Sequence, residues 1–309
     1  MKTDNWKAIH WAVVALASAL LSGSGALAEP INVLIVTGQH SHDWEESTAM
    51  MQKILQTVPG IEVDVSRTPE KGSPKTAWDG WRPEFARYDC VIIDYNQERW
   101  PDEVNRALEE YVAGGGGVMV IHAAKNAFPG WKAYEDMVGL LWRNSQFGYS
   151  PYYDAEGRLV RDEPGEGPAS AHGSNYPWKM TTRDTSHPIT SDFPKHWVHA
   201  LDEFYHAPRS RIDESNVHIL VSGYSDAAKG GTGREEPVLW WIPYGKGKCL
   251  TNTMGHVMMR QPGNTLQSMQ CVGFQVTLIR GVQWLATGKC ALPLPDRFPV
   301  DEVRLRELK

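Results

Sequence analysis

Short apolar runs alternate with amphipathic stretches along the first half of the chain. Buried strands are short, apolar and rich in β-branched residues, whereas helices repeat apolar positions every three or four residues. By this criterion the expected strands are 31–37, 61–65, 88–94 and 118–121. The expected helices are 44–58, 101–113 and 131–141. Strands of this kind that alternate with helices form parallel sheets covered on both faces. The sequence therefore predicts an α/β fold with a doubly wound, mostly parallel sheet.

The pattern breaks between residues 143 and 215. This stretch is rich in Gly, Pro, Tyr and charged residues and has no helical periodicity. A long irregular segment of this kind is typical of an insertion or a functional loop, and we expect it to carry a few antiparallel strands, such as 178–182. Later expected elements are strands at 217–222, 237–242 and 248–253, a closing helix at 266–286 and a peripheral C-terminal extension at 291–309.

Residues 1–28 have the composition of a secretory signal peptide. Lysines near the start precede the apolar run Trp11–Leu21, and small residues follow, ending in Ala26-Leu27-Ala28. This order of basic, apolar and small residues predicts cleavage after Ala28. Glu29 follows and no cysteine lies at the site, so we expect no lipid anchor. The expected mature protein, 29–309, is periplasmic or secreted, with no membrane anchor.

Charge and aromatic content narrow the expected partners. The formal net charge is −6, which argues against the basic footprint of a nucleic-acid-binding protein. Thirteen tryptophans are present, and Trp44, Trp131 and Trp142 lie beside polar strand ends. Aromatic rings there would suit stacking on a sugar face, although core packing is their more common use. The expected partner is a small sugar, and the sequence leaves the oligomeric state open.

Histidines follow the apolar runs that predict strands. His40 and His42 follow the first strand, His122 follows 118–121, and His256 follows 248–253. The carboxyl ends of parallel strands meet at one edge of a sheet, which is where open α/β folds build their sites. Glu203 lies in a loop that could fold over this edge. We therefore predict His122, His256 and Glu203 as catalytic residues.

A metal is one of two hypotheses for these histidines. Imidazoles are ligands for zinc, and three protein ligands with an open position define a catalytic zinc site. On this hypothesis His42, His122 and His256 bind a divalent metal such as zinc. The spacing is not that of His-Glu-x-x-His, however. The alternative is that the histidines bind sugar hydroxyls or act as general bases without a metal.

An ordered series of short motifs resembles the ThuA-like (trehalose-utilisation) family over about Asn32 to Gly288. The motifs are the glycine run followed by VIHAAKNAF, Trp131-Lys132-Ala133-Tyr134, Met137-Val138-Gly139, His187-Pro188-Ile189, Asp202-Glu203-Phe204-Tyr205, Tyr244-Gly245-Lys246-Gly247 and Gly255-His256. The resemblance implies a flavodoxin-like sheet of the class I glutamine amidotransferase type. It also implies carbohydrate catabolism, particularly of oxidised (3-keto) glycosides.

The implied substrate suggests a chemistry. A ketone at sugar C3 acidifies the hydrogen at C2, so a base can remove it while the glycosidic oxygen at C1 leaves. A histidine with a pKa near the working pH suits this step, and His122 and His256 are equal candidates. Glu203 would orient a histidine or act as an acid. Expected substrate contacts are His40, Trp44, Lys125, Asn126, Trp131 and Tyr205, where the plainer interpretations are a solvated charge for Lys125, a helix cap for Asn126 and an anchored surface tyrosine for Tyr205.

The amidotransferase resemblance does not extend to the nucleophile. Those enzymes carry a cysteine on a Gly-x-Cys-x-Gly turn, and here the corresponding residue is His122, with Ala124 in place of the second glycine. Covalent acyl transfer of that kind needs a thiolate, so we expect no glutaminase activity. Two alternatives to a 3-keto-glycoside enzyme are a hydrolase of this fold with another substrate and a non-catalytic carbohydrate-binding protein.

Overall fold

The computed structural model describes residues 30–258 and 265–308. The predicted signal peptide, residues 1–28, lies outside this range. Among the described helices, none is both long enough and apolar enough to cross a bilayer.

Five parallel strands form one half of the central sheet, in the order β2–β1–β3–β4–β13. Their bounds are β1 (Ile31–Thr37), β2 (Ile61–Arg67), β3 (Cys90–Ile93), β4 (Gly117–Ile121) and β13 (Gly247–Asn252). Ile93 pairs with Val120, and Ile121 pairs with Asn252, so β3, β4 and β13 end side by side. The prediction that 31–37, 90–94 and 117–121 are neighbouring parallel strands is confirmed.

Antiparallel strands continue the same sheet beyond β13, in the order β12–β11–β8–β9. They are β12 (Glu235–Tyr244), β11 (His218–Tyr224), β8 (Tyr176–Thr182) and β9 (His196–Asp202), with the hairpin β5 (Ser150–Tyr153) and β6 (Leu159–Asp162) joined to β12. The two short strands β7 (Ala171–His172) and β10 (Tyr205–His206) pair separately. The expectation of an irregular insertion at 143–215 therefore needs correction, because much of this segment extends the sheet.

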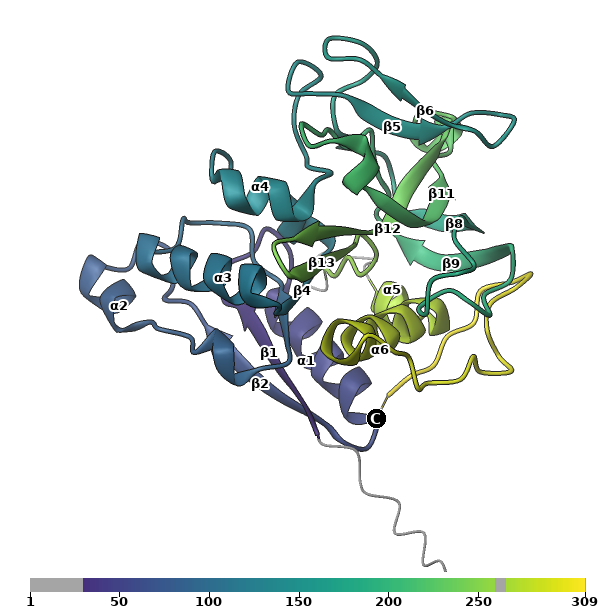
Figure 1. Ribbon diagram of the computed structural model, residues 1–309. Coiled ribbons are helices and arrows are strands. Elements are labelled where there is room, and N and C mark those ends of the chain that lie inside the picture. Colours follow the sequence, from purple (N-terminus) through teal and green to yellow (C-terminus); the bar gives the residue numbers. More distant parts are fainter. Residues whose placement is uncertain (1–29, 259–264, 309) are drawn as a thin grey trace, which may run out of the picture.

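Helices cover both faces of the parallel half (Figure 1). One face packs against α1 (Trp44–Gln56), α5 (Gln267–Gln270) and α6 (Val272–Thr287), and the other against α2 (Lys75–Gly80), α3 (Asp102–Gly114) and α4 (Lys132–Val138). Alternate residues of β1 serve the two cores, since Ile35 packs with the α1 side and Val36 with the α3 side. The closing helix predicted at 266–286 is broken at Cys271, whose backbone is extended in ψ (125°).

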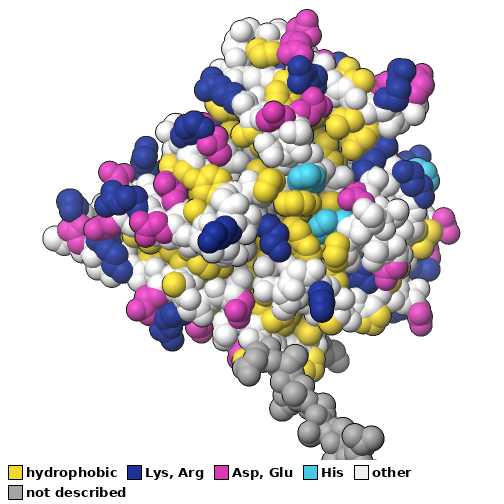
Figure 2. Space-filling model, viewed as in Figure 1, with side chains coloured by type: hydrophobic (Ala, Val, Ile, Leu, Met, Phe, Trp, Pro, Cys, Tyr) yellow, Lys and Arg dark blue, Asp and Glu magenta, His cyan; other side chains and the backbone are white. Residues whose placement is uncertain are grey.

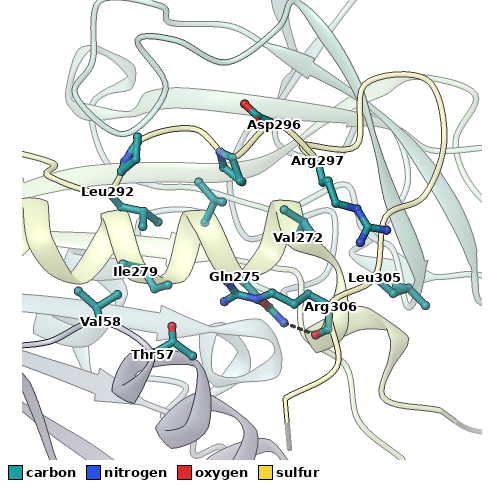
Figure 3. Close-up of a pocket in the computed structure, with 13 residues that line it drawn as sticks. Thr57, Val58, Val272, Gln275, Ile279, Leu292, Asp296, Arg297, Leu305 and Arg306 are labelled. Carbon is teal, nitrogen blue, oxygen red and sulfur yellow. Dashed lines mark hydrogen bonds between the residues drawn. The ribbon is translucent and has the colours of Figure 1, made fainter.

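Short 3-10 helices complete the fold at η1 (Phe85–Arg87), η2 (His122–Asn126), η3 (Glu214–Asn216) and η4 (Ala227–Lys229). The C-terminal segment runs back over α6, and a hydrogen bond from Arg306 Nε to Gln275 Oε1 ties it to that helix. An apolar pocket lies between them, with Val58, Ile279 and Leu292 in its wall (Figure 3). Val58 follows the end of α1, whereas the polar strand ends lie near the start of that helix.

Candidate active site

Three imidazoles and one carboxylate converge beyond the ends of the parallel strands. One side-chain atom from each of His42, His122, Glu203 and His256 lies within 4.8 Å of the others. Glu203 Oε2 is 3.4 Å from His122 Nε2 and 3.8 Å from His42 Nε2. The His42 and His256 ring centroids are 4.6 Å apart. The structure therefore brings together all three histidines that the sequence predicted as metal ligands, with Glu203 among them.

The parallel topology explains this convergence. His122 directly follows β4, and His256 follows β13, the strand paired with β4. His42 follows β1 after a tight turn at Gly38, whose φ is +125° and where a Cβ atom would lie 2.6 Å from Thr68 Oγ1. Only glycine fits this turn without a clash. Three histidines that are far apart in the sequence thus reach one edge because their strands are neighbours.

His122 is held in an unusual backbone conformation. Its φ is +47°, a region that residues other than glycine, asparagine and aspartate seldom adopt. The side chain is 2% exposed, and Nδ1 donates a hydrogen bond of 2.7 Å to the Thr253 carbonyl. This bond fixes the ring so that Nε2 faces Glu203 Oε2, 3.4 Å away. A strained residue with a fixed ring orientation is typical of functional sites.

The Glu203 carboxylate lies at the centre of the imidazoles. Burial opposes its ionisation, but His122 outweighs burial and, with smaller contributions from His256 and His172, lowers the pKa of Glu203 to about 2. Burial likewise lowers the pKa of His122, but Glu203 reverses this and the net shift of the His122 pKa is upward. Burial and the neighbouring imidazoles lower the pKa values of His42 and His256. At neutral pH the site therefore holds an ionised carboxylate beside the neutral imidazoles of His42 and His256.

His40 lies behind His42 and supports it. Its Nδ1 accepts a hydrogen bond of 3.0 Å from the His42 main-chain N–H, and its Nε2 is 3.5 Å from Asp94 Oδ1. Asp94 in turn accepts a hydrogen bond from the Ser47 hydroxyl at 2.5 Å. The His40 side chain is 2% exposed, and burial lowers its pKa to about 3. The predicted substrate contact at His40 therefore needs correction: the residue orients the His42 segment.

Aromatic rings and one lysine form the adjoining wall. The Tyr205 ring stacks on His122 with centroids 4.4 Å apart, and Trp142 meets Tyr205 edge-on at 4.9 Å. Lys125 Nζ lies 5.0 Å from the Tyr205 centroid and 5.5 Å from that of Trp142. Lys125 is 1% exposed, and burial, aided by Arg143, lowers its pKa to about 7. The interpretation of Lys125 as a solvated surface charge is therefore wrong.

The remaining predicted contacts divide into two groups. Asn126 is half-buried and its side chain neighbours the Tyr205 hydroxyl, so it belongs to the wall. Trp44 is half-buried at the start of α1, with the Arg67 guanidinium 4.8 Å from its ring. Trp131 is 4% exposed, packs against Trp100, and donates a hydrogen bond from Nε1 to Glu109. The prediction that Trp131 contacts a sugar therefore needs correction, because its ring belongs to the core on the α3 side.

Sequence reasoning missed His172 in the short strand β7. His172 pairs in register with Tyr205 of β10, and its Nδ1 lies 3.2 Å from Glu203 Oε1. The side chain is 45% exposed, so this imidazole stands between the buried cluster and solvent. A two-residue strand leaves no periodic pattern, and no signal in the sequence pointed to its partner.

His187 and His218 lie apart from the cluster. They pack with Trp241 and Trp284. On the face drawn in Figure 2, histidine side chains lie among hydrophobic ones. Burial lowers the pKa of His187 to about 4 despite the opposing charge of Asp184. Both residues were left out of the predicted site, and the structure places them with a separate aromatic group.

His187→Gln should leave catalysis unchanged and reduce acid sensitivity. Because its folded pKa, about 4, lies below the ordinary histidine value of 6.5, wild-type His187 contributes stability above pH 6.5. This contribution is lost as the pH falls towards 4, since the unfolded chain binds the proton more readily. Urea unfolding at pH 7 and pH 5 measures the effect. The stability difference between these pH values should be smaller in the variant; an equal or larger one would contradict the assigned pKa shift.

The residues of the cluster fit a divalent metal. His122 Nε2, Glu203 Oε2 and His42 Nδ1 are buried and make no hydrogen bond to any described residue. In a tetrahedral zinc site with bonds of about 2.0–2.1 Å, ligand atoms lie about 3.4 Å apart. One ring nitrogen from each of His42, His122 and His256 lies within 4.8 Å of the others, so small side-chain rotations would bring them to that spacing, with Glu203 Oε2 beside them. The hydrogen bond from His122 to a carbonyl is the outer contact that orients metal-binding imidazoles.

Comparison with known proteins places the chain in a family of α/β proteins with a glutamine amidotransferase-like fold. The family model described as ThuA, trehalose utilisation, matches residues 32–285. The chain belongs to the ThuA family. The resemblance inferred from the sequence motifs is thereby confirmed.

Solved structures agree with this assignment. A ThuA-like protein from Parabacteroides merdae is 36% identical, with a TM-score of 0.81, over 90% of this chain and 98% of its own. A ThuA-like protein from Bacteroides uniformis is 18% identical, with a TM-score of 0.52, over 85% of this chain and 96% of its own, which shows the shared fold alone. No curated protein matches the sequence.

Proposed function

We propose that this protein is an exported enzyme of carbohydrate catabolism that acts on oxidised (3-keto) glycosides. The observation that carries the proposal is the convergence of three imidazoles and an ionised carboxylate in one buried cluster. Sugar binding alone needs mainly aromatic, amide and carboxylate groups. The family's description, trehalose utilisation, supports a sugar substrate. The signal-peptide prediction for residues 1–28 supports a periplasmic or secreted location.

We propose that His42, His122 and His256 hold a divalent metal such as zinc, which leaves Glu203 beside it. A metal in this place would supply positive charge that stabilises an enolate oxygen. Because Glu203 is then the free basic group of the cluster, it is the group that we assign to accept the proton from C2. This choice replaces His122 and His256 as candidates for the base. In a metal-free site His256, a neutral imidazole, would have that task.

The proposed step is a β-elimination, and addition of water to the new double bond is the hydration that follows it. The C2–H bond breaks and its proton passes to Glu203, the electron pair forms the C1=C2 double bond, and the C1–O bond breaks. The departing oxygen takes up a proton. His172 is 3.2 Å from Glu203 and half-exposed, so it is the group placed to exchange protons between the carboxylate and the mouth of the site. Trp142 is the partly exposed ring of this wall, so the sugar ring would lie against it. Behind it are Tyr205 and the Lys125 amine, which has no hydrogen-bond partner among the described residues.

The chemistry proposed here differs from that of the thiol-dependent amidotransferases. Those enzymes place the nucleophile on a strained turn between a strand and a helix, and His122 occupies the corresponding turn with positive φ. For the sheet we propose the flavodoxin-like arrangement, since β2–β1–β3–β4–β13 follows the strand order of that class.

Comparing a 3-keto-glucoside with its parent glucoside tests the proposal. Release of the aglycone is expected from the keto compound alone, with loss of the activity after chelation and recovery on addition of Zn²⁺. Equal turnover of the parent glucoside would indicate an ordinary hydrolase. Binding of either compound without turnover would indicate a carbohydrate-binding protein. Turnover that survives exhaustive chelation would remove the metal from the proposal and leave the substrate in it.

Lys125→Met should lower activity without destabilising the protein. The Lys125 amine is buried and makes no hydrogen bond to any described residue, so methionine removes an uncompensated polar group while keeping the apolar stem. Loss of one hydrogen bond from a charged group to the sugar corresponds to a fall in kcat/KM of about 10- to 100-fold. The matched control is Lys132→Met, since the Lys132 side chain is 85% exposed on α4. Equal kinetics for the two variants would contradict the role of Lys125.

A further inference from the structure

One buried carboxylate connects the two segments that carry Glu203 and His256. Asp202 Oδ1 accepts hydrogen bonds from the main-chain N–H groups of Glu203, at 2.7 Å, and His256, at 3.0 Å. Asp202 Oδ2 accepts one from the Gly255 N–H at 2.8 Å and lies 2.8 Å from His199 Nε2. The Asp202 side chain is fully buried. Asp202 ends β9, at the far edge of the sheet from the parallel strands, whereas residues 255–256 follow β13.

We propose that Asp202 is the positioning residue of this site, fixing the His256 imidazole among the metal ligands and the Glu203 carboxylate beside them. This inference rests on the proposed function for the metal, and it extends it by naming the group that assembles the ligands. Three main-chain N–H groups in two segments point at one carboxylate, so neither segment can move without breaking a hydrogen bond. The side chains that follow are therefore presented in fixed directions.

His199 and its neighbours hold Asp202 in place. The His199 ring is fully buried, lies 4.9 Å from the Trp178 ring, and neighbours Cys271 at the start of α6. Trp178 Nε1 also donates a hydrogen bond to the Asp202 carbonyl at 3.3 Å. Side chain and main chain of Asp202 are thus both anchored in the core. The geometry of the site is transmitted from β8, β9 and α6 rather than from flexible loops.

The position of the Asp202 carboxylate indicates that it orients the site as well as stabilising the fold. A buried carboxylate is costly unless it is fully hydrogen-bonded, and apolar residues could fill the same space at lower cost. Among the residues that the structure describes, every hydrogen bond to the carboxylate comes from the two site segments or from His199. Groups just outside the ligands of a metal orient them, and losing one weakens metal binding by about 10- to 100-fold.

The test compares Asp202→Asn with Asp192→Asn in the full protein. In Asp202→Asn one acceptor oxygen becomes an NH₂ group, which faces the Gly255 N–H, so the 255–256 segment loses its anchor. Asp192 pairs with the buried Arg280 away from the cluster, so its amide variant controls for a general loss of stability. Co²⁺ is the probe, because its visible spectrum reports ligand geometry. The expected result is Co²⁺ affinity about 10- to 100-fold weaker, with altered absorption bands, in Asp202→Asn alone.

Further measurements separate failure of this inference from failure of the proposed function. If Asp202→Asn does not fold, His199→Phe takes its place. It keeps an aromatic ring and removes only the contact to Asp202 Oδ2, so we expect a smaller loss of Co²⁺ affinity. If Asp202→Asn binds Co²⁺ with the affinity of the wild type, the inference is overturned but the proposed metal site is not. If the wild-type protein binds no Co²⁺, the metal proposal fails, and amide hydrogen exchange decides the inference. Faster exchange at residues 203, 255 and 256 in Asp202→Asn supports it, and unchanged exchange overturns it.

Discussion

The His122→Asn protein should fold normally and fail to turn over a 3-keto-glucoside. Because the φ of His122 is +47°, asparagine is a better replacement than alanine, since asparagine adopts this region with less strain. His122→Ala should be equally inactive. Loss of a metal-binding or proton-transferring imidazole is expected to lower kcat/KM by about 100- to 10,000-fold.

Steady-state kinetics and a thermal melt on each protein measure this effect, with His187→Gln as the control. Only the His122 variants should lose activity while their melting temperatures stay near that of the wild type. Full activity in either His122 variant would exclude a role for this residue in the reaction.

Glu203→Gln should have the second large effect. Glutamine has nearly the same shape as glutamate but can neither accept the C2 proton nor supply negative charge among the imidazoles. Loss of a general base lowers kcat by about 100- to 10,000-fold. KM should change little, because Trp142, Tyr205 and Lys125, which we expect beside the sugar, are unchanged. A variant that retains kcat and has only a raised KM would show that Glu203 binds substrate without moving a proton.

In the metal-free protein, the effect of Glu203→Gln on the free energy of unfolding should depend on pH. The folded-state pKa of Glu203, about 2, lies below the ordinary glutamate value of 4.5. Its ionisation therefore contributes stability above pH 4.5, and this contribution is lost as the pH falls towards 2. Urea unfolding in the presence of chelator should show a larger wild-type advantage over Glu203→Gln at pH 5 than at pH 3. An advantage that is the same at both pH values would contradict the shift.

The parallel half of the fold could be predicted because its signal is local. The run from Val118 to Ile121 is apolar on both faces, as a central parallel strand must be, and the helices between such runs have clear apolar stripes. The antiparallel half lacks this signal. β8 alternates buried and exposed residues and contains Pro177, and its partner β11 lies far along the chain. Its place in the sheet depends on tertiary pairing.

The site was predictable where it follows directly from strand ends. His42, His122 and His256 each come soon after an apolar run, so parallel topology was enough to bring them together. His172 and Asp202 were missed because their importance arises from contacts across the β7–β10 pair and the edge of β9.

Aromatic and charged residues were harder to interpret from the sequence alone. Lys125 is buried by Trp142 and Tyr205, two rings that are distant in the sequence. Trp131 shows the opposite difficulty, since the sequence pattern around a tryptophan does not distinguish a core ring from one that contacts a ligand.

Anomalous scattering from a crystal grown with Zn²⁺ tests the central claim most directly, because it locates the ion without reference to activity. The account predicts one strong peak at the zinc edge among the imidazoles of His42, His122 and His256, with the Glu203 carboxylate beside it. The account would be contradicted if no peak appears, or if the ion is bound elsewhere while these imidazoles stay apart.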